Sequence, residues 1–197
     1  MLTGTQLRSL LRTHGLRLTK QLGQHHLVDA RLIARVTASC DLSLEETVVE
    51  IGAGLGALTE PLAQQAKRVI ALEIDRKIAA LLTERMRAFR NVTVRHEDIL
   101  RFSWKPFTPT PNLGVGVNQV TVVGAIPYHI TSPILVSLCE ARHAIRKAVL
   151  IVQTEVADRL LAEPGTKAYG RLTILGQYCW RITSLMSVPR SAFFPQP

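Results

Sequence analysis

Three alternating glycines that directly follow a short apolar run constrain the fold of this chain most. The run Thr47–Ile51 is rich in β-branched residues and predicts a buried strand, Gly52, Gly54 and Gly56 follow at once, and a helical pattern begins near Ala57. Glycine permits the unusual dihedrals of a tight turn and lets a ligand approach the backbone closely. Such a turn places free N–H groups and a helix N-terminus at the carboxyl end of a strand. The stretch therefore predicts a ligand-binding turn in an α/β fold.

Strand and helix patterns alternate along the rest of the chain. A stretch with three prolines and two glycines, residues 105–118, predicts a loop. The alternation indicates a doubly wound, mostly parallel sheet that binds ligands beyond the carboxyl ends of its strands. The predicted further strands cover residues 68–73, 91–96, 119–123, 147–152 and 180–188, and the predicted helices cover 29–40, 57–66, 76–88, a segment from about 132, 154–162 and 170–178.

The charge of the chain favours a polyanionic partner. With 24 Lys and Arg against 15 Asp and Glu, the net charge is +9, which suits a nucleic acid or an anionic membrane surface. Six of the basic residues and a single acidic residue, Asp29, precede residue 40. That basic start has the composition of an organellar transit peptide, but we favour a helix that belongs to the domain because a motif follows it directly.

Composition also excludes several classes of protein. The three cysteines are scattered without a C-x-x-C pair, which argues against a disulfide framework and fits a reducing compartment. No metal-ligand cluster is visible, so we expect no metal. No stretch approaches 18 uncharged apolar residues, so we expect no membrane span.

Two carboxylates indicate the kind of ligand. Glu73 ends the second predicted strand about 20 residues after the turn, the spacing at which a ribose is bound. A dinucleotide dehydrogenase and a methyltransferase that uses S-adenosylmethionine both fit this feature. The G-x-G-x-G spacing favours the methyltransferase, because a dehydrogenase usually has G-x-G-x-x-G to seat a pyrophosphate. Asp98, after the third strand, would then accept a hydrogen bond from the adenine amino group, or it is only a helix cap or turn former.

At this point the chain resembles the rRNA adenine N6-dimethyltransferases of the KsgA type, which are related to the erythromycin-resistance rRNA methylases. The resemblance covers nearly the whole chain. It is carried by Gly23-Gln24-x-x-Leu27-Val28-Asp29, Glu50-Ile51-Gly52-x-Gly54-Leu55-Gly56, Ala71-Leu72-Glu73-Ile74-Asp75, Ile126-Pro127-Tyr128-x-Ile130-Thr131-Ser132-Pro133, Lys167-Ala168-Tyr169-Gly170-Arg171-Leu172 and Ser191-Ala192-Phe193-Phe194-Pro195.

The resemblance implies a Rossmann-like methyltransferase fold and dimethylation of adenine N6 in small-subunit rRNA during ribosome biogenesis. It implies a cytoplasmic monomer that uses S-adenosylmethionine and acts on the immature small ribosomal subunit. We expect residues 1–28 to form a basic segment that packs on the cofactor site and residues 29–197 to form the catalytic domain. The chain would be C-terminally truncated, because relatives continue past Phe-Phe-Pro-x-Pro with a final strand and a small helical domain.

The resemblance also assigns the site. A flipped-out adenine would stack on Tyr128, with Phe193 or Phe194 on its other side. The backbone carbonyl of Ile126 and the residue at position 125 would accept hydrogen bonds from its amine. The full set of expected site residues is Ala125, Ile126, Tyr128 and Phe193 for catalysis, and His25, Leu27, Gly52, Gly54, Glu73, Asp98 and Ala125 for the cofactor.

The chain departs from the family pattern in two places. Ala125 stands where the family has an Asn, and it cannot accept the hydrogen bond of the target amine. His25-His26 stand where the family usually has Asn-Phe. These departures leave three hypotheses open: an rRNA dimethyltransferase of reduced activity, an RNA-binding assembly factor that keeps the fold, and, less favoured, a small-molecule methyltransferase.

Overall fold

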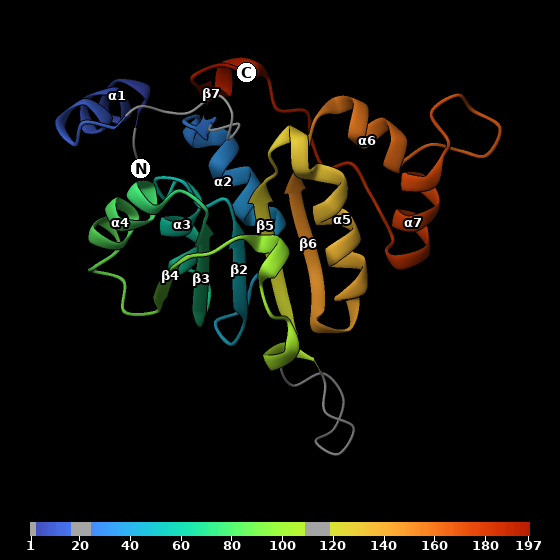
Figure 1. Cartoon of the computed structure of the whole chain (residues 1–197), viewed down its shortest axis with the longest axis horizontal. Coiled ribbons are helices and arrows are strands. Elements are labelled where there is room, and N and C mark those ends of the chain that lie inside the picture. Colours follow the sequence, from blue (N-terminus) through green and yellow to red (C-terminus); the bar gives the residue numbers. More distant parts are fainter. Residues whose placement is uncertain (1–2, 17–24, 109–118) are drawn as a thin grey trace.

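The computed structural model describes residues 3–16, 25–108 and 119–197 of the chain. Its centre is a sheet of five parallel strands in the order β4-β3-β2-β5-β6 (Figure 1). The strands are β2 (Thr47–Ile51), β3 (Arg68–Glu73), β4 (Val92–His96), β5 (Val120–Ala125) and β6 (Ile145–Ile151). The predicted parallel α/β architecture is therefore confirmed.

Helices cover both faces of this sheet because successive strand residues point to opposite sides. On one face, Val69 and Ala71 of β3 pack against α2 (Ala30–Ser39), α3 (Thr59–Ala63) and α4 (Arg76–Arg85). On the other face, Ile70 and Leu72 pack with α5 (Thr131–Glu140) and the 3₁₀ turn η2 (Ile99–Arg101). The sheet is thus doubly wound, as the alternating patterns predicted.

Two helices near the C-terminal part of the chain form a further layer. Helix α6 (Thr154–Leu160) packs on α7 (Arg171–Cys179), and α7 packs on α5. Short 3₁₀ turns also occur, namely η3 (Lys105–Phe107), η4 (Tyr128–Ile130), η5 (Arg142–Ala144) and η6 (Arg190–Ala192).

A second, two-stranded sheet joins a segment of the N-terminal part of the chain to one near its C-terminus. Strand β1 (His26–Leu27) pairs in antiparallel register with β7 (Phe193–Phe194), so that His26 lies opposite Phe194 and Leu27 opposite Phe193. The N–H of Val28 extends the pairing by donating to the carbonyl of Ala192 at 2.8 Å. Nothing in the local sequence indicated this pairing, because it joins segments more than 160 residues apart.

The first helix, α1 (Gly4–Thr13), packs beside the glycine turn. A capping box between Thr3 and Gln6 starts the helix. Its buried Leu7 and Leu11 form one cluster with Leu55 of the turn and with apolar residues of α4. The basic start of the chain is therefore a helix of the same structure. The predicted motif residues Gly23 and Gln24 lie outside the described residues.

The structure corrects two predictions about secondary structure. Residues 180–188 are not a strand but an irregular, largely exposed segment, and only part of the predicted 57–66 helix forms, as α3. A strand is stable only when its backbone groups find partners, and no hydrogen-bonded ladder joins 180–188 to β6. Of the predicted 105–118 loop, residues 109–118 lie outside the described residues.

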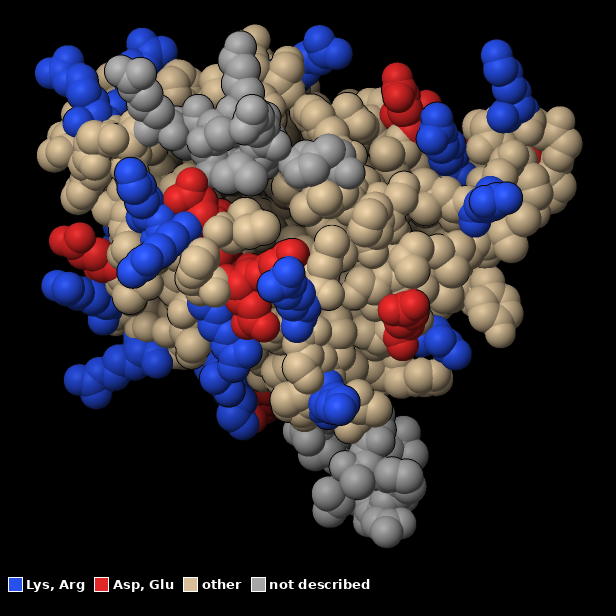
Figure 2. All heavy atoms as spheres, in the orientation of Figure 1, with Lys and Arg blue, Asp and Glu red and all other residues tan. Residues whose placement is uncertain are grey.

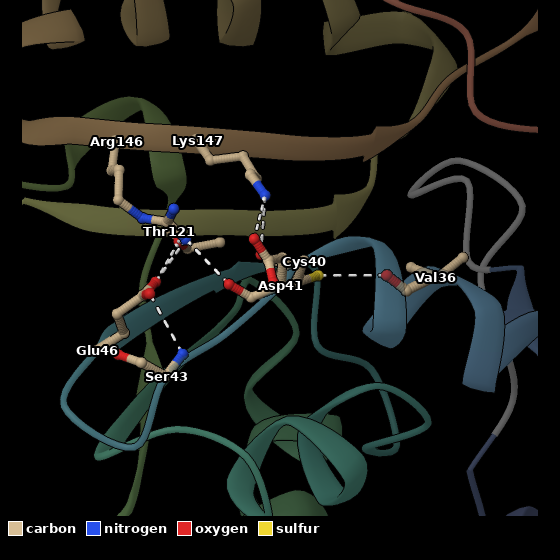
Figure 3. Close-up of polar contacts among 8 residues, drawn as sticks. All are labelled: Val36, Cys40, Asp41, Ser43, Glu46, Thr121, Arg146 and Lys147. Carbon is tan, nitrogen blue, oxygen red and sulfur yellow. Dashed lines mark hydrogen bonds and ion pairs between the residues drawn. The ribbon is translucent and has the colours of Figure 1, made fainter.

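A polar network links the amino ends of β5 and β6 to the loop before β2 (Figure 3). These strand ends lie opposite the glycine turn. Arg146 Nη2 of β6 contacts Glu46 Oε2 at 2.7 Å, and the same oxygen accepts a hydrogen bond from Thr121 of β5 at 2.9 Å. Lys147 Nζ lies 3.8 Å from an Asp41 carboxylate oxygen. The network therefore holds the loop before β2 against both β5 and β6.

Candidate functional site

The predicted site residues Gly52, Glu73 and Ala125 lie at the carboxyl ends of β2, β3 and β5. Gly52 and Gly54 follow β2 with φ of 66° and 56°, in the region that favours glycine. A Cβ on Gly52 would lie 3.6 Å from the carbonyl oxygen of Ala125, at the end of β5. The turn therefore passes close to the backbone of β5, and the lack of a side chain at Gly52 leaves space between them.

The side chain of Glu73 is tied to this turn. Its Oε2 accepts the N–H of Gly54 at 2.8 Å, and its Oε1 accepts the N–H of Asp75 at 2.9 Å. Burial raises the pKa of Glu73, while the hydrogen bonds from Asp75 and Gly54 oppose that shift. Each carboxylate oxygen can accept a further hydrogen bond, so Glu73 can still receive the hydroxyl groups of a ligand.

Asp98 serves locally as a cap. Its Oδ1 accepts the N–H of Leu100 at 3.0 Å and begins the turn η2. This is the structural role that the sequence left open as an alternative. A carboxylate that caps with one oxygen keeps its second oxygen for a ligand.

Tyr128 and His25 form an aromatic pair on the other side of the site. Their ring centroids are 5.9 Å apart with an interplanar angle of 23°. The Nδ1 atom of His25 lies 2.8 Å from the carbonyl oxygen of Pro195. Tyr128 is 43% exposed, so its ring is not a core side chain. Burial raises the pKa of its hydroxyl, and the charge of Arg190 partly opposes that shift.

A cavity of about 990 Å³ lies on the Tyr128 side of the site, and Gly52, Gly54, Glu73 and Asp98 are not among its lining residues. Its lining includes His25, Ala125, Ile126, Tyr128 and Phe193. From there it continues between β6 and the irregular segment 180–188. The structure therefore brings the residues predicted for catalysis to one cavity.

The two C-terminal phenylalanines have different surroundings. Phe193 lines the cavity and also packs against the hydrophobic core. Phe194 instead joins the cluster of α1 and lies under the guanidinium of Arg8, 5.1 Å from its ring centroid. Only Phe193 is placed to face a ligand in the cavity.

The sequence did not assign a role to His26, which the structure places directly on the turn. The ring is 8% exposed, and a Cβ on Gly54 would lie 2.6 Å from its Nδ1 atom. Burial, and secondarily the charge of His25, lower the pKa of His26 to about 4. Its neighbour Leu27, predicted to contact the cofactor, is buried in the hydrophobic core. Arg190, which lines the cavity, was also missed, although it stands only three residues before Phe193.

The described ranges contain neither a metal-binding cluster nor a membrane-spanning helix. Within residues 3–16, 25–108 and 119–197, no group of three or more His, Cys, Asp or Glu side chains is placed to hold a metal ion. Over the same ranges, no helix is both long enough and apolar enough to cross a bilayer.

Comparison with known proteins decides the family. The family model described as ribosomal RNA adenine dimethylase matches residues 15–197. The chain belongs to this family. The motif resemblance predicted from the sequence is thereby confirmed.

Relatives in this dimethylase family are similar over most of the chain. It is 40% identical over 195 residues to ribosomal RNA small subunit methyltransferase A of Anoxybacillus flavithermus, covering 99% of this chain and 65% of the relative. The protein of the same name from a Geobacillus species is also 40% identical, over 96% of this chain and 65% of the relative. The chain thus spans about 65% of the length of these curated relatives.

Solved structures show the same fold. A dimethyladenosine transferase from Plasmodium falciparum matches with a TM-score of 0.76 and 30% identity, over 88% of this chain and 59% of that chain. The 23S rRNA methyltransferase ErmE matches with a TM-score of 0.68 and 32% identity, over 87% and 64%. The Rossmann-like methyltransferase fold predicted for this dimethylase-family chain is therefore confirmed.

Proposed function

We propose that this chain transfers methyl groups from S-adenosylmethionine to N6 of adenine in small-subunit ribosomal RNA. The observation that carries the proposal is the meeting of the glycine turn, the buried Glu73 and the exposed Tyr128 at one end of the sheet. Family membership and the names of the relatives support the same reaction.

The turn and its neighbours suit S-adenosylmethionine. Gly52 leaves backbone without a side chain beside the end of β5, whereas the His26 ring occupies the space beside Gly54. Glu73 would bind the ribose hydroxyls, since a buried carboxylate with free lone pairs is a strong acceptor. Asp98 would receive the adenine amino group of the cofactor, and His25 and Ala125 would border its methionine end. We also propose that residues 1–28 complete this side of the site, because α1 packs on Leu55 of the turn.

The other half of the site suits a flipped-out base. An exposed aromatic ring gives a base a stacking surface worth about 1–3 kcal/mol. Tyr128 provides that ring, and Phe193 lines the cavity beside it. The target amine would donate to the backbone carbonyl of Ile126, while the methyl side chain of Ala125 cannot accept a hydrogen bond.

Basic side chains suit the RNA. Figure 2 shows Lys and Arg gathered over the part of the molecule that holds α1, α4 and β4. The exposed basic residues on these elements are Arg8, Arg12, Arg76, Lys77 and Arg95. They would contact phosphates, so affinity should fall steeply with salt. We further propose that the protein acts as a monomer in the cytoplasm on the immature small subunit.

Bound S-adenosylmethionine supplies an electrophilic methyl group. The chain itself would bind and orient the two reactants. Orientation and fixed dipoles therefore account for the rate, without a covalent intermediate.

A methyl-transfer assay on immature small ribosomal subunits tests the proposal. With radiolabelled S-adenosylmethionine, the chain should label adenine in the rRNA. Tyr128→Ala should reduce labelling at least about tenfold, because a stacking contact is lost. Tyr178→Ala is the matched control, because Tyr178 lies on α7 and is 81% exposed. If the folded chain binds RNA without any labelling, the proposed reaction is wrong and an RNA-binding role takes its place.

A further inference from the structure

His25 carries a hydrogen-bond acceptor that nothing else in the described structure uses. Its Nδ1 atom lies 2.8 Å from the carbonyl oxygen of Pro195. A carbonyl oxygen can only accept, so Nδ1 bears the hydrogen. In the neutral ring this leaves Nε2 as an acceptor, and no other described residue forms a hydrogen bond with it. The contact with Pro195 thus fixes the tautomer of the ring.

The position of the ring is fixed as well. His25 directly precedes β1, whose Leu27 is anchored in the core and paired with Phe193. His26, the next residue in the chain, packs against Gly54. His25 is therefore held by its own bond to Pro195 and through its neighbour His26, which packs on the glycine turn.

The ring lies beside the place proposed for the base. A centroid distance of 5.9 Å at a tilt of 23° is typical of an offset aromatic pair. Such a pair leaves part of the Tyr128 face free, in agreement with its 43% exposure. A base stacked on that face would have its edge toward the imidazole. His25, Ala125 and Tyr128 line the same cavity.

We propose that Nε2 of His25 accepts a hydrogen bond from the amino group of the target adenine, in place of the side chain that Ala125 lacks. This inference rests on the proposed methyl transfer to adenine. The amine is a poor nucleophile because its lone pair is delocalised into the ring. Acceptors placed on its N–H groups favour the tetrahedral nitrogen whose lone pair can attack. The two departures from the family pattern, at positions 25 and 125, then compensate for each other.

The first test does not depend on activity. With ¹⁵N-labelled imidazoles, NMR should show His25 as the Nδ1–H tautomer. Adding adenosine in the presence of S-adenosylhomocysteine should shift the Nε2 resonance. Purine riboside, which lacks the amino group, should leave that resonance in place. Equal responses to adenosine and purine riboside, or no response to either, would overturn the proposal.

The second test uses activity and a rescue. His25→Phe keeps a ring but removes the acceptor, and it should lower the turnover rate about 100-fold, as does removal of one preorganised hydrogen-bonding group. Ala125→Asn in the same background should restore most of that rate. His143→Phe, at an exposed position in η5, is the matched control and should keep the parent rate.

The two tests separate this inference from the proposed function. If the parent transfers methyl groups and His25→Phe does so equally well, only the role of His25 is wrong. If neither the parent nor Ala125→Asn transfers methyl groups, the proposed reaction is wrong, and the NMR comparison alone decides whether His25 meets an adenine amine.

Discussion

The backbone N–H of Gly54 donates to the buried carboxylate of Glu73 at 2.8 Å, and this bond links the turn after β2 to the end of the neighbouring strand β3. Gly54 belongs to the turn after β2, whereas Glu73 is the last residue of β3. The bond holds the turn at a fixed distance from the carboxylate that would bind the ribose. The shape of the cofactor site therefore depends on an interaction within the protein as well as on its ligand.

Replacing Glu73 by Gln should weaken the binding of S-adenosylmethionine at least about tenfold. The amide keeps the size of the side chain but loses charge-assisted hydrogen bonds, which contribute about 1.5–3 kcal/mol each. Isothermal calorimetry measures the dissociation constant directly. Glu84→Gln, an exposed change on α4, is the control and should bind as the parent does. An unchanged dissociation constant for Glu73→Gln would show that the carboxylate is not a ligand.

The parts of the fold that follow local periodicity could be predicted from the sequence. The apolar run of β2, the three glycines and the carboxylate of Glu73 are separated by short, regular spacings, and the parallel order follows from the alternation of elements. These features correctly placed the glycine turn and Glu73 at the carboxyl ends of neighbouring strands.

The parts that depend on distant contacts could not be predicted. The pairing of β1 with β7 joins opposite ends of the chain, and the strand expected over 180–188 lacks a ladder partner. His26 occupies the space beside Gly54 only because β1 is held there. No pattern within a window of ten residues contains this information, so its consequences for the site emerge only in three dimensions.

Gly54→Ala should destabilise the protein and abolish cofactor binding. The alanine would have to adopt a left-handed backbone conformation, with φ near 56°. Its Cβ would lie 2.6 Å from Nδ1 of the His26 ring. Gly165→Ala is a matched control, because Gly165 has a φ of 85° and open space around it. The strain alone costs about 1–2 kcal/mol, so urea unfolding should show that loss for Gly165→Ala and a clearly larger one for Gly54→Ala. Equal losses would mean that the contact with His26 is readily relieved.

The contribution of His26 to the stability of the parent should fall as the pH falls from about 6.5 toward 4. Burial, followed by the charge of His25, lowers the pKa of His26 from 6.5 to about 4 in the folded state. The unfolded chain therefore binds the proton first on acidification, and folding loses about 2–3 kcal/mol by pH 4.5. Urea unfolding of the parent and of His26→Phe at pH 7.5 and 4.5 isolates this loss, because the buried Glu50, whose pKa burial raises to about 8, changes the stability in the opposite direction over the same range.

His26→Phe should remove that part of the pH dependence, since Phe does not titrate. His143→Phe is the control and should keep the slope of the parent. A parent and a His26→Phe variant with the same loss of stability between the two pH values would show that His26 is not responsible for it.

Glu46→Gln should lower the free energy of unfolding by about 1 kcal/mol without changing the affinity for S-adenosylmethionine. Although desolvation raises the pKa of Glu46, hydrogen bonds from Thr121, Ser43 and Arg146 lower it overall, so the ionised form is stabilised by the fold. The network lies at the amino ends of β5 and β6, away from the glycine turn. Figure 3 shows its contacts.

Glu45, the residue before Glu46, provides the control. It pairs with Lys67 at 2.8 Å, but the two side chains are 82% and 62% exposed. Glu45→Gln should therefore leave the urea midpoint unchanged, because exposed pairs contribute little. Equal effects of the two substitutions would show that the polar network around Glu46 does not stabilise the link between the loop before β2 and strands β5 and β6.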